Sequence, residues 1–389
     1  MSTVPAPVQP PRTGVAVLYG LAAKVMQFKD GVSLGRGDPD FDTPLHIREA
    51  VREAVEAPTR AKPAERVRAE LHQAIARRLK AINNIDADPE TEIVLTQGGQ
   101  EALVLMVMAA LGPGDEIILP EPTYSTYADA IKMAGGVRVS LKTRLEENFA
   151  IDPDRVRALI TPRTRAISLV SPNNPTAAVL APDVVRELCR IAEEHDIIIL
   201  ADEIYDRFLY EGAVHTSPAS LPGVGARTMT LNALSKAYAM TGWRLGWVAG
   251  PAPLMGQLRR IKEAMSADVS SLSLYAGLAT LTGPQQPLHD MVAAYTRRRA
   301  IVMRAFDRMG LPYGRPQGGQ FLFADIRSVG MPAFEFVDRM VDEAHVLVYP
   351  GISFGEDWTG FVRTTFLQSE EVLEGALNRM ADFVARVRR

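Results

Sequence analysis

The sequence predicts an α/β protein with a large domain, built on a mostly parallel, helix-covered sheet, and a smaller α+β domain built from both chain termini. From about residue 92, short apolar runs alternate with helix-type segments. The runs are apolar at consecutive positions, which is typical of parallel strands that helices cover on both faces. After about residue 285 this alternation ends, and a long helical segment precedes mixed strands and helices.

The elements of the large domain follow in order along the chain. Strands are expected at 92–96, 116–120, 137–142, 165–171 and 197–202, and in the segments TMTLNAL and WRLGWVAG. Helices are expected in QEALVLMVMAAL, STYADAIKMAGG and DVVRELCRIAEEH, and in DPDRVRALI, where Asp152 is a cap and Pro153 takes the first helical position.

The smaller domain is expected to begin with a helix over 287–309, followed by the strand-like segments GQFLFADI, HVLVYP and FVRTTF. The loop-like LGRGDPDFDTP precedes the first expected helix of the chain. The predicted division is a flexible arm at 1–14, a small domain at 15–45 and 285–389, and a large cofactor-binding domain at 46–284.

Composition limits the function classes. The net charge of −3 gives no electrostatic basis for binding nucleic acid or a membrane surface. No apolar run approaches the roughly 18 residues of a membrane span, and the start lacks the apolar core of a signal peptide. The single cysteine, Cys189, suits a reducing compartment, so a cytoplasmic protein is expected. The six histidines are far apart in sequence, so no metal site is expected.

Polar residues follow the apolar strands, at the end of the sheet where ligands of open α/β folds bind. They are Gly98 and Gly99, Asn174, Asp202, Tyr205, Lys236, Arg244 and, within a later strand, Arg363. Each alone has a simple structural explanation, such as a helix cap, a turn or a solvent-reaching arginine. Their common position at strand ends favours a binding site instead.

The segment NALSKAYAMTGWRLGW places Lys236 and Arg244 in apolar surroundings without an acidic residue. Such cations either reach the surface or have a partner outside the chain. Pyridoxal phosphate would be a suitable partner, because it carries an aldehyde, a basic ring nitrogen and a phosphate. Lys236 would form a Schiff base with the aldehyde, and Asp202 would pair with the ring nitrogen.

The remaining candidate residues would bind the ring oxygen and the phosphate of this cofactor and the carboxylate of its substrate. Tyr205 and Asn174 would bind the phenolic oxygen of the ring. Arg244, Ser235 and the amides of Gly98 and Gly99 would hold the phosphate. Arg363 would bind the substrate carboxylate through its planar guanidinium group.

The motifs GDPDFDTP, TQGGQEAL, SPNNPT, ADEIY, LSKAYAMTGWRLGW and FVRTTF together resemble those of fold-type I, class I aminotransferases of the aspartate and aromatic branch. The likeness covers nearly the whole chain from about residue 30. It implies the same roles for Lys236, Asp202, Tyr205 and the two arginines. It also implies Tyr124 on the cofactor face, Gln100 among the cofactor-binding residues, Gly37 and Asn174 at the substrate, and a homodimer with sites at the subunit interface.

The sequence departs from this family at four places. Lys62 or a neighbour stands where a tyrosine usually reaches the other subunit's phosphate. Ala177 replaces a usual glycine, and Ala233 replaces a phosphate-binding serine of some members. Gln100 stands where several members that act on acidic substrates carry lysine.

Gln100 bears on the substrate, because it supplies no charge for a second carboxylate. With Leu18, Tyr19 and Tyr124 nearby in the expected fold, it favours a neutral, apolar or aromatic amino donor over aspartate. Arg36, in the loop LGRGDP, is the alternative cation that would reverse this expectation.

Other reaction classes fit less well. The segment GISFG resembles the nucleophile elbow of hydrolases, but the last histidine, His345, precedes Ser353, so the required triad order fails. The segment GRGDPD lacks the third glycine of a nicotinamide-binding turn. A regulatory protein would be expected to have lost Lys236 or Asp202. A β-eliminating C–S lyase on the same fold stays open, since it would share these motifs.

Overall fold

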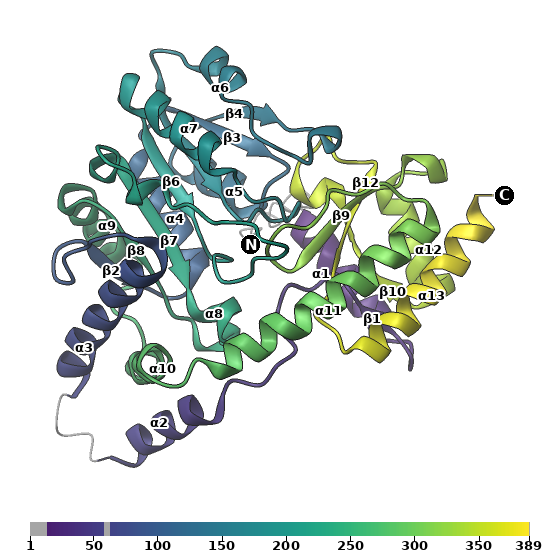
Figure 1. Ribbon diagram of the computed structural model, residues 1–389, viewed down its shortest axis with the longest axis horizontal. Coiled ribbons are helices and arrows are strands. Elements are labelled where there is room, and N and C mark those ends of the chain that lie inside the picture. Colours follow the sequence, from purple (N-terminus) through teal and green to yellow (C-terminus); the bar gives the residue numbers. More distant parts are fainter. Residues whose placement is uncertain (1–13, 58–62, 389) are drawn as a thin grey trace, which may run out of the picture.

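The computed structural model of the chain describes residues 14–57 and 63–388, and its centre is a seven-stranded sheet (Figure 1). The strand order is β2-β8-β7-β6-β5-β3-β4. Strand β8 runs in the opposite direction to the other six strands. The expected mostly parallel sheet is therefore confirmed, with one reversed strand. The strands are β2 (Ile93–Thr96), β3 (Glu116–Glu121), β4 (Val137–Lys142), β5 (Thr164–Val170), β6 (Ile198–Asp202), β7 (Thr228–Ala233) and β8 (Gly246–Ala249).

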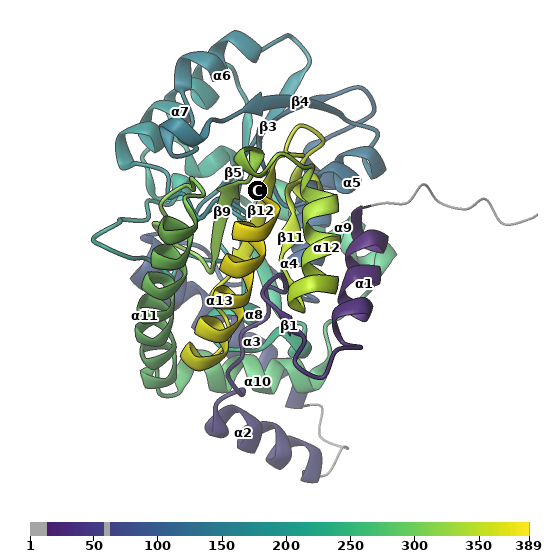
Figure 2. The same ribbon diagram turned by 90° about the vertical axis from the view of Figure 1, so that its right-hand side faces the viewer.

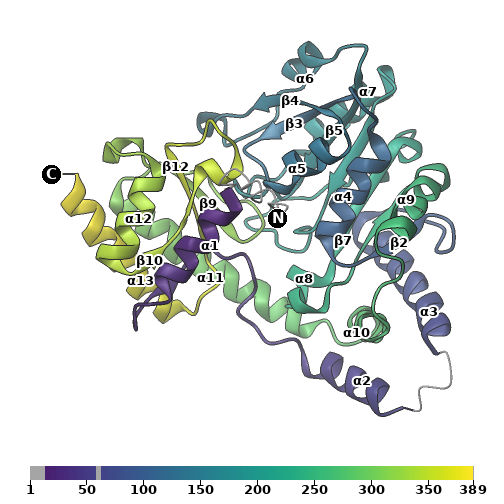
Figure 3. The ribbon, with the colours of Figure 1, turned by 180° about the vertical axis from the view of Figure 1, so that it is seen from behind.

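Helices cover both faces of this sheet, as Figures 1 and 3 show from opposite sides. On β3, Leu119 packs in a core with α4 and α5, whereas its neighbour Ile118 packs in a core with α7. This two-sided burial explains why the strands are continuously apolar. The covering helices are α4 (Gly99–Ala110), α5 (Thr126–Met133) and α9 (Ala252–Met265) on one face, and α6 (Pro153–Leu159) and α7 (Pro182–Glu194) on the other. The Asp152 side chain caps α6 as expected, and Pro153 takes its first position.

Three helices, α2 (Leu45–Glu56), α3 (Pro63–Arg78) and α10 (Ser271–Thr282), pack together beside the β2 edge of the sheet (Figure 1). A π-helical turn, Leu79–Asn83, extends α3. The short α8 (Leu234–Ala237) follows β7 directly and carries Lys236. None of the helices within the described residues is long and apolar enough to span a bilayer.

The two ends of the chain meet in the other part of the structure, where β1 (Val32–Ser33) pairs in parallel with β10 (Val346–Leu347). A three-stranded antiparallel sheet, β11-β12-β9, lies beside them. Figure 2 shows α1 next to α12, and α13 next to α11. The bounds are β9 (Phe321–Asp325), β11 (Tyr349–Pro350), β12 (Phe361–Thr365), α1 (Gly14–Val25), α11 (Gln286–Met309), α12 (Ala333–Ala344) and α13 (Glu370–Val387).

Two expectations for this part were wrong. Helix α1 precedes the loop that was expected to lead into the first helix. Its first turn holds no acidic residue, and burial of Leu21 and Val25 stabilises it instead. The segment HVLVYP is two strands, because 346–347 pairs with β1 and 349–350 pairs with β12. The expected arm falls largely on residues 1–13, outside the described part, and the proposed domain boundaries stay a prediction.

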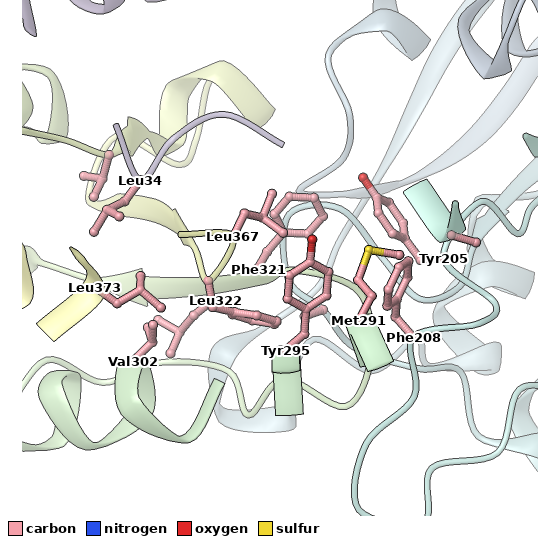
Figure 4. Packing of buried hydrophobic residues seen from close by; sticks show 14 of the residues in the cluster. Leu34, Tyr205, Phe208, Met291, Tyr295, Val302, Phe321, Leu322, Leu367 and Leu373 are labelled. Atoms are coloured by element: carbon pink, nitrogen blue, oxygen red, sulfur yellow. The ribbon is translucent and has the colours of Figure 1, made fainter. Parts of the chain in front are cut away.

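A shared apolar core connects the loop after β6 to strand β9 (Figure 4). The ring of Tyr205 meets the edge of Phe321 with 5.3 Å between centroids. Phe208 and Tyr295 of α11 lie 5.7 Å apart. This packing fixes the loop that carries Tyr205 next to the sheet that carries Arg363.

Candidate active site

A cavity of about 540 Å³ lies where the carboxyl ends of β5, β6 and β7 face β9 and β12. Residues from segments far apart in sequence line it, as expected for the strand ends of an α/β sheet. The lining includes Gly37, Gly99, Gln100, Tyr124, Asn174, Asp202, Tyr205, Ser235, Lys236, Arg244 and Arg363. Of the residues predicted for the site, Gly98 alone is not part of this lining.

Lys236 extends from α8 into the cavity and is largely buried. Its Nζ donates a hydrogen bond to the carbonyl oxygen of Gly37 at 2.7 Å and lies 3.4 Å from Oδ1 of Asp38. Burial lowers the pKa of Lys236, and the charge of Asp38 opposes that shift. The expectation that Lys236 has no partner in the chain is therefore wrong, because Asp38 comes from a loop distant in sequence.

Asp202 ends β6 and is buried with only neutral hydrogen-bond donors. Its Oδ2 accepts from the hydroxyl of Tyr127 at 3.3 Å, and its Oδ1 accepts from the backbone N–H of Ile204 at 3.2 Å. Burial raises the pKa of Asp202 to about 6. A cation placed beside this carboxylate would reverse that shift, so the site fits a protonated ring nitrogen.

Arg363 lies on β12 and is buried among the rings of Phe321, Tyr349 and Phe354, each within 5.1 Å of its guanidinium carbon. Its Nη1 donates to Oδ1 of Asn174 at 2.8 Å, and its buried Nε has no hydrogen-bond partner. Burial lowers the pKa of Arg363 to about 10. A carboxylate ligand would supply the anion that this cation lacks among the described residues.

Asn174 and Tyr205 stand on the same side of the cavity as Arg363. The amide of Asn174 is held by its contact with that arginine. The hydroxyl-bearing ring of Tyr205 is buried, and burial raises the pKa of its phenol. Both side chains can therefore give or receive neutral hydrogen bonds at the ring oxygen of a bound cofactor.

The opposite end of the cavity suits an anion. Helix α4 begins at Gly99, so its first N–H groups are free for a ligand. Gly98 has φ of 81°, and a Cβ there would lie 2.7 Å from Nη2 of Arg244. Arg244 is exposed, and its guanidinium donates to the carbonyl oxygens of Thr241 and Gln97 at 3.1 and 3.2 Å. Ser235 lines the cavity nearby and is buried.

Several functional residues escaped the sequence analysis. Tyr127 holds Asp202, and its place three residues after Tyr124 in TYSTY was the available signal. Asp38 follows Gly37 within GDPDFDTP, but only the folded chain brings it to Lys236. The aromatic rings around Arg363 come from three separate segments, which no local pattern joins.

The structure places most of the residues at which the sequence departs from the family pattern. Ala177 adopts φ of 61°, a left-handed conformation that explains the usual glycine there. Ala233 is buried at the end of β7. Leu18 and Gln100 line the cavity. Lys62 and the side chain of Tyr19 lie outside the described part of the structure.

A buried polar network joins the two strand ends that carry Asp202 and Lys236. Arg78 of α3 donates to both oxygens of Asp206 at 2.9 and 2.7 Å. The amide of Asn232 on β7 donates to Oδ2 of Asp206 at 3.0 Å and to the carbonyl oxygen of Glu203 at 2.8 Å. Asn83, in the π-helical turn, donates to the carboxylates of Glu203 and Asp206 at 2.7 and 3.1 Å. This network fixes the separation of the two segments.

The hydrolase alternative gains no support from the geometry. Ser353 lines the cavity, but none of the described lining residues is a histidine. His345 instead places its Nδ1 2.7 Å from Oδ1 of Asp30. A serine, histidine and carboxylate triad is therefore absent from the described lining of this cavity.

Residues 29–380 match the family "Aminotransferase class I and II". The chain belongs to this family. Family members use pyridoxal 5'-phosphate, and the aminotransferase falls in the EC 2.6.1 class.

Its relatives include enzymes named for different substrates. The aminotransferase is 38% identical to aromatic-amino-acid aminotransferase 2 of Thermococcus litoralis, over 90% of each chain. It is 39% identical to arginine–pyruvate transaminase AruH of Pseudomonas aeruginosa, over 93% of this chain and 92% of the relative. The solved structure of Thermus thermophilus aspartate aminotransferase with maleate matches with a TM-score of 0.88 and 36% identity, over 98% of this chain and 100% of that one.

Proposed function

We propose that the aminotransferase moves an amino group between an L-amino acid and a 2-oxo acid, with pyridoxal 5'-phosphate attached through Lys236. The observation that carries this proposal is one cavity lined by a largely buried lysine, a buried carboxylate that has no cation beside it and a buried arginine that has no anion beside it among the described residues. The bound cofactor would supply an electron sink for the substrate Cα and a temporary carrier for the amino group.

In this proposal the residues of the chain bind, orient and move protons. Asp202 holds a positive charge on the ring nitrogen, a pairing worth roughly 4 kcal/mol at about 4 Å and an effective dielectric constant near 20. Arg363 binds the substrate α-carboxylate, with Gly37 and Asn174 beside it. Lys236 takes the proton from the Cα of the donor amino acid. At the end of the transfer it gives a proton to the Cα of the amino acid formed from the oxo acid.

The phosphate and ring contacts complete the arrangement. Arg244, Ser235 and the amide of Gly99 hold the phosphate. The N–H of Gly98, also predicted for this role, instead donates to the carbonyl oxygen of Thr96 at 2.8 Å. The remaining contacts, to the ring and its oxygen, come from Gln100, Tyr124, Asn174 and Tyr205.

The test is reduction of the cofactor-loaded protein with borohydride, followed by peptide mapping. The cofactor should be fixed to the peptide that contains Lys236, and Lys236→Ala should lose turnover. Lys80→Ala, which alters an exposed ion pair with Asp86, is the control and should keep its activity. Labelling of another lysine would refute the proposal.

The acceptor requirement separates a transaminase from a C–S lyase. Amino donors are tested against 2-oxoglutarate, pyruvate and oxaloacetate. Turnover should depend on the 2-oxo acid. Release of ammonia and pyruvate without an acceptor would identify the lyase instead.

For the donor, we propose a neutral, apolar or aromatic amino acid. The cavity wall includes Leu18, Leu103 and Phe354, and Gln100 adds no charge. Among the described lining residues, the one cation without a task in the proposal is Arg36, which is exposed and has its Nη2 3.1 Å from Oδ2 of Asp38. The value of kcat/KM should be higher for phenylalanine, leucine or alanine than for aspartate. A preference for aspartate that Arg36→Ala removes would identify Arg36 as the distal cation.

We also propose that the protein is a cytoplasmic homodimer. Leu45 and Val55 on α2 and Leu272 on α10 are exposed apolar side chains on helices that pack together (Figure 1). Exposed apolar side chains on packed helices are consistent with an interface between two copies of the chain. Sedimentation equilibrium should give twice the 42.5 kDa chain mass. The single cysteine, Cys189, supports the cytoplasmic location because it suits a reducing compartment, and cell fractionation tests this location.

A further inference from the structure

The side chain of Lys236 ends beside the loop that carries Gly37 and Asp38, and two groups of this loop contact its Nζ. The contacts are the carbonyl oxygen of Gly37 at 2.7 Å and Oδ1 of Asp38 at 3.4 Å. Within the described part of the chain, Asp38 is the one carboxylate that forms an ion pair with this lysine. The same loop therefore supplies both a neutral acceptor and a charge.

Asp38 is shared between two cations at different depths. Its second oxygen, Oδ2, lies 3.1 Å from Nη2 of Arg36. The side chain of Lys236 is 15% exposed, that of Asp38 37% and that of Arg36 67%. The three groups form a chain of alternating charge from the interior of the cavity to solvent.

The other charged and titratable groups around Lys236 do not replace this carboxylate. Arg363 from β12 and Arg244 from the segment before β8 are cations, and they oppose a positive charge on the lysine. Asp202 from β6 also lines the cavity but forms no ion pair with Lys236. The phenols of Tyr124, Tyr205 and Tyr349 line it as well. Asp38 is thus the nearest source of negative charge.

We propose that Asp38 is a positioning residue that stabilises the protonated form of Lys236 whenever its amine is free, and that Arg36 weakens this effect by competing for the same carboxylate. The catalytic meaning rests on the proposed function. When the lysine takes a proton, the substrate Cα–H bond breaks, an Nζ–H bond forms, and the electron pair stays on the substrate side. The ammonium group formed in this way is the species that Asp38 favours.

The direct test uses the cofactor-free protein and does not depend on catalysis. Lys236 is acetylated with limiting acetic anhydride across a pH series, and mass spectrometry measures the rate at its peptide. The variants are Asp38→Asn, Arg36→Gln and the control Asp42→Asn, which removes an exposed carboxylate from the same loop. Only the unprotonated amine reacts, so the rate reports the protonation of Lys236.

The two variants should act in opposite directions. Asp38→Asn should raise the labelling rate at neutral pH about fivefold, the factor expected for loss of a partly exposed ion pair. Arg36→Gln should lower that rate, and Asp42→Asn should leave it unchanged. Equal pH profiles for all variants, or shifts of Asp38→Asn and Arg36→Gln in the same direction, would overturn the proposal.

A second measurement uses the cofactor-loaded enzyme. Asp38→Asn should lower kcat about three- to tenfold with little change in KM, and Asp38→Glu should recover most of the loss. Circular dichroism and the melting temperature establish that each variant folds. If labelling shifts as expected but no acceptor supports turnover, the proposed function fails while the pairing stands. If turnover is present but labelling does not shift, the proposed role of Asp38 is refuted while the proposed function stands.

Discussion

At the scale of single residues, the chemistry of this protein depends on charged groups that are buried without a full set of partners. Among the residues that the structure describes, the Asp202 carboxylate has only the N–H of Ile204 and the hydroxyl of Tyr127, and Arg363 has only neutral acceptors such as Asn174. Burial of an unpaired charge costs free energy that a ligand of opposite charge recovers. The unpaired charges therefore lower the stability of the empty cavity, and they favour ligands that carry the opposite charges at these two positions.

The ionisation of Asp202 should appear in the stability of the cofactor-free protein. Its pKa is about 6 in the folded chain against 3.8 for the ordinary group, so the folded state binds the proton more tightly. This contribution is favourable at low pH and is lost as pH rises from about 4 to 6, by about 3 kcal/mol. The difference in the free energy of urea unfolding between wild type and Asp202→Asn should change by this amount between pH 4 and pH 6. A constant difference would contradict the assignment.

The same carboxylate should matter for turnover. Loss of roughly 4 kcal/mol of pairing in Asp202→Ala should lower kcat by on the order of a thousandfold, while some cofactor binding remains. The measurement is steady-state kinetics at saturating cofactor. A variant with nearly wild-type kcat would remove Asp202 from the mechanism.

Arg363→Lys keeps the charge but loses the planar pair of donors. We expect KM for both the amino acid and the oxo acid to rise about thirtyfold, the effect of roughly 2 kcal/mol from a charged hydrogen bond. Arg327→Lys is the matched control, because Arg327 binds Asp325 next to the same sheet but does not line the cavity. Unchanged KM values for both substrates in Arg363→Lys would exclude the carboxylate role.

At the scale of elements, the site depends on how helix α3, the loop after β6 and strand β7 are joined by buried polar groups. Burial alone would raise the pKa of Asp206, but Arg78, with help from His215 and Asn83, holds it below its usual value. The guanidinium of Arg78 also lies 5.3 Å from the ring of Trp247 on β8. The ionised pair is therefore part of the scaffold and not of the cavity lining.

Removing one partner of such a pair leaves a buried charge unpaired. Asp206→Asn should lower the free energy of unfolding by about 3 kcal/mol, measured with urea at neutral pH. Asp86→Asn, which breaks the exposed pair with Lys80, should cost less than about 1 kcal/mol. Equal losses in the two variants would show that the network contributes no more than a surface ion pair.

The elements also show how far the sequence could be interpreted. Local patterns predicted the covered strands and the helix that begins at Pro153, because each depends on neighbouring residues. The strand ends brought Asn174, Asp202 and Lys236 to one cavity as expected. The reversal of β8, and the division of 346–350 between two sheets, depend on partners distant in sequence. The pairing of Asp38 with Lys236 is of the same kind, since no spacing rule connects the two loops.

At the scale of the whole molecule, the cavity lies between the seven-stranded sheet and the three-stranded sheet. Lys236 follows β7 of the first, and Arg363 lies on β12 of the second. A ligand that contacts both stabilises the folded chain by mass action.

Cofactor addition should therefore raise the melting temperature. At a concentration of 100 times Kd the stabilisation is about 2.7 kcal/mol, which corresponds to a rise of roughly 3 °C for a chain of this size. Differential scanning fluorimetry measures the shift. Pyridoxal at the same concentration lacks the phosphate and should give a smaller rise. Equal shifts would argue against the anion site at Gly99 and Arg244.

The pairing of β1 with β10 has a consequence for biosynthesis. Val32 is synthesised 314 residues before its partner Val346. At about 5–20 residues per second, that delay is roughly 15–60 s. During this interval Leu21 and Val25 of α1, which are buried in the finished fold, have no α12 to pack against. The nascent N-terminal segment therefore keeps its apolar face available to chaperones until α12 and β10 have been made.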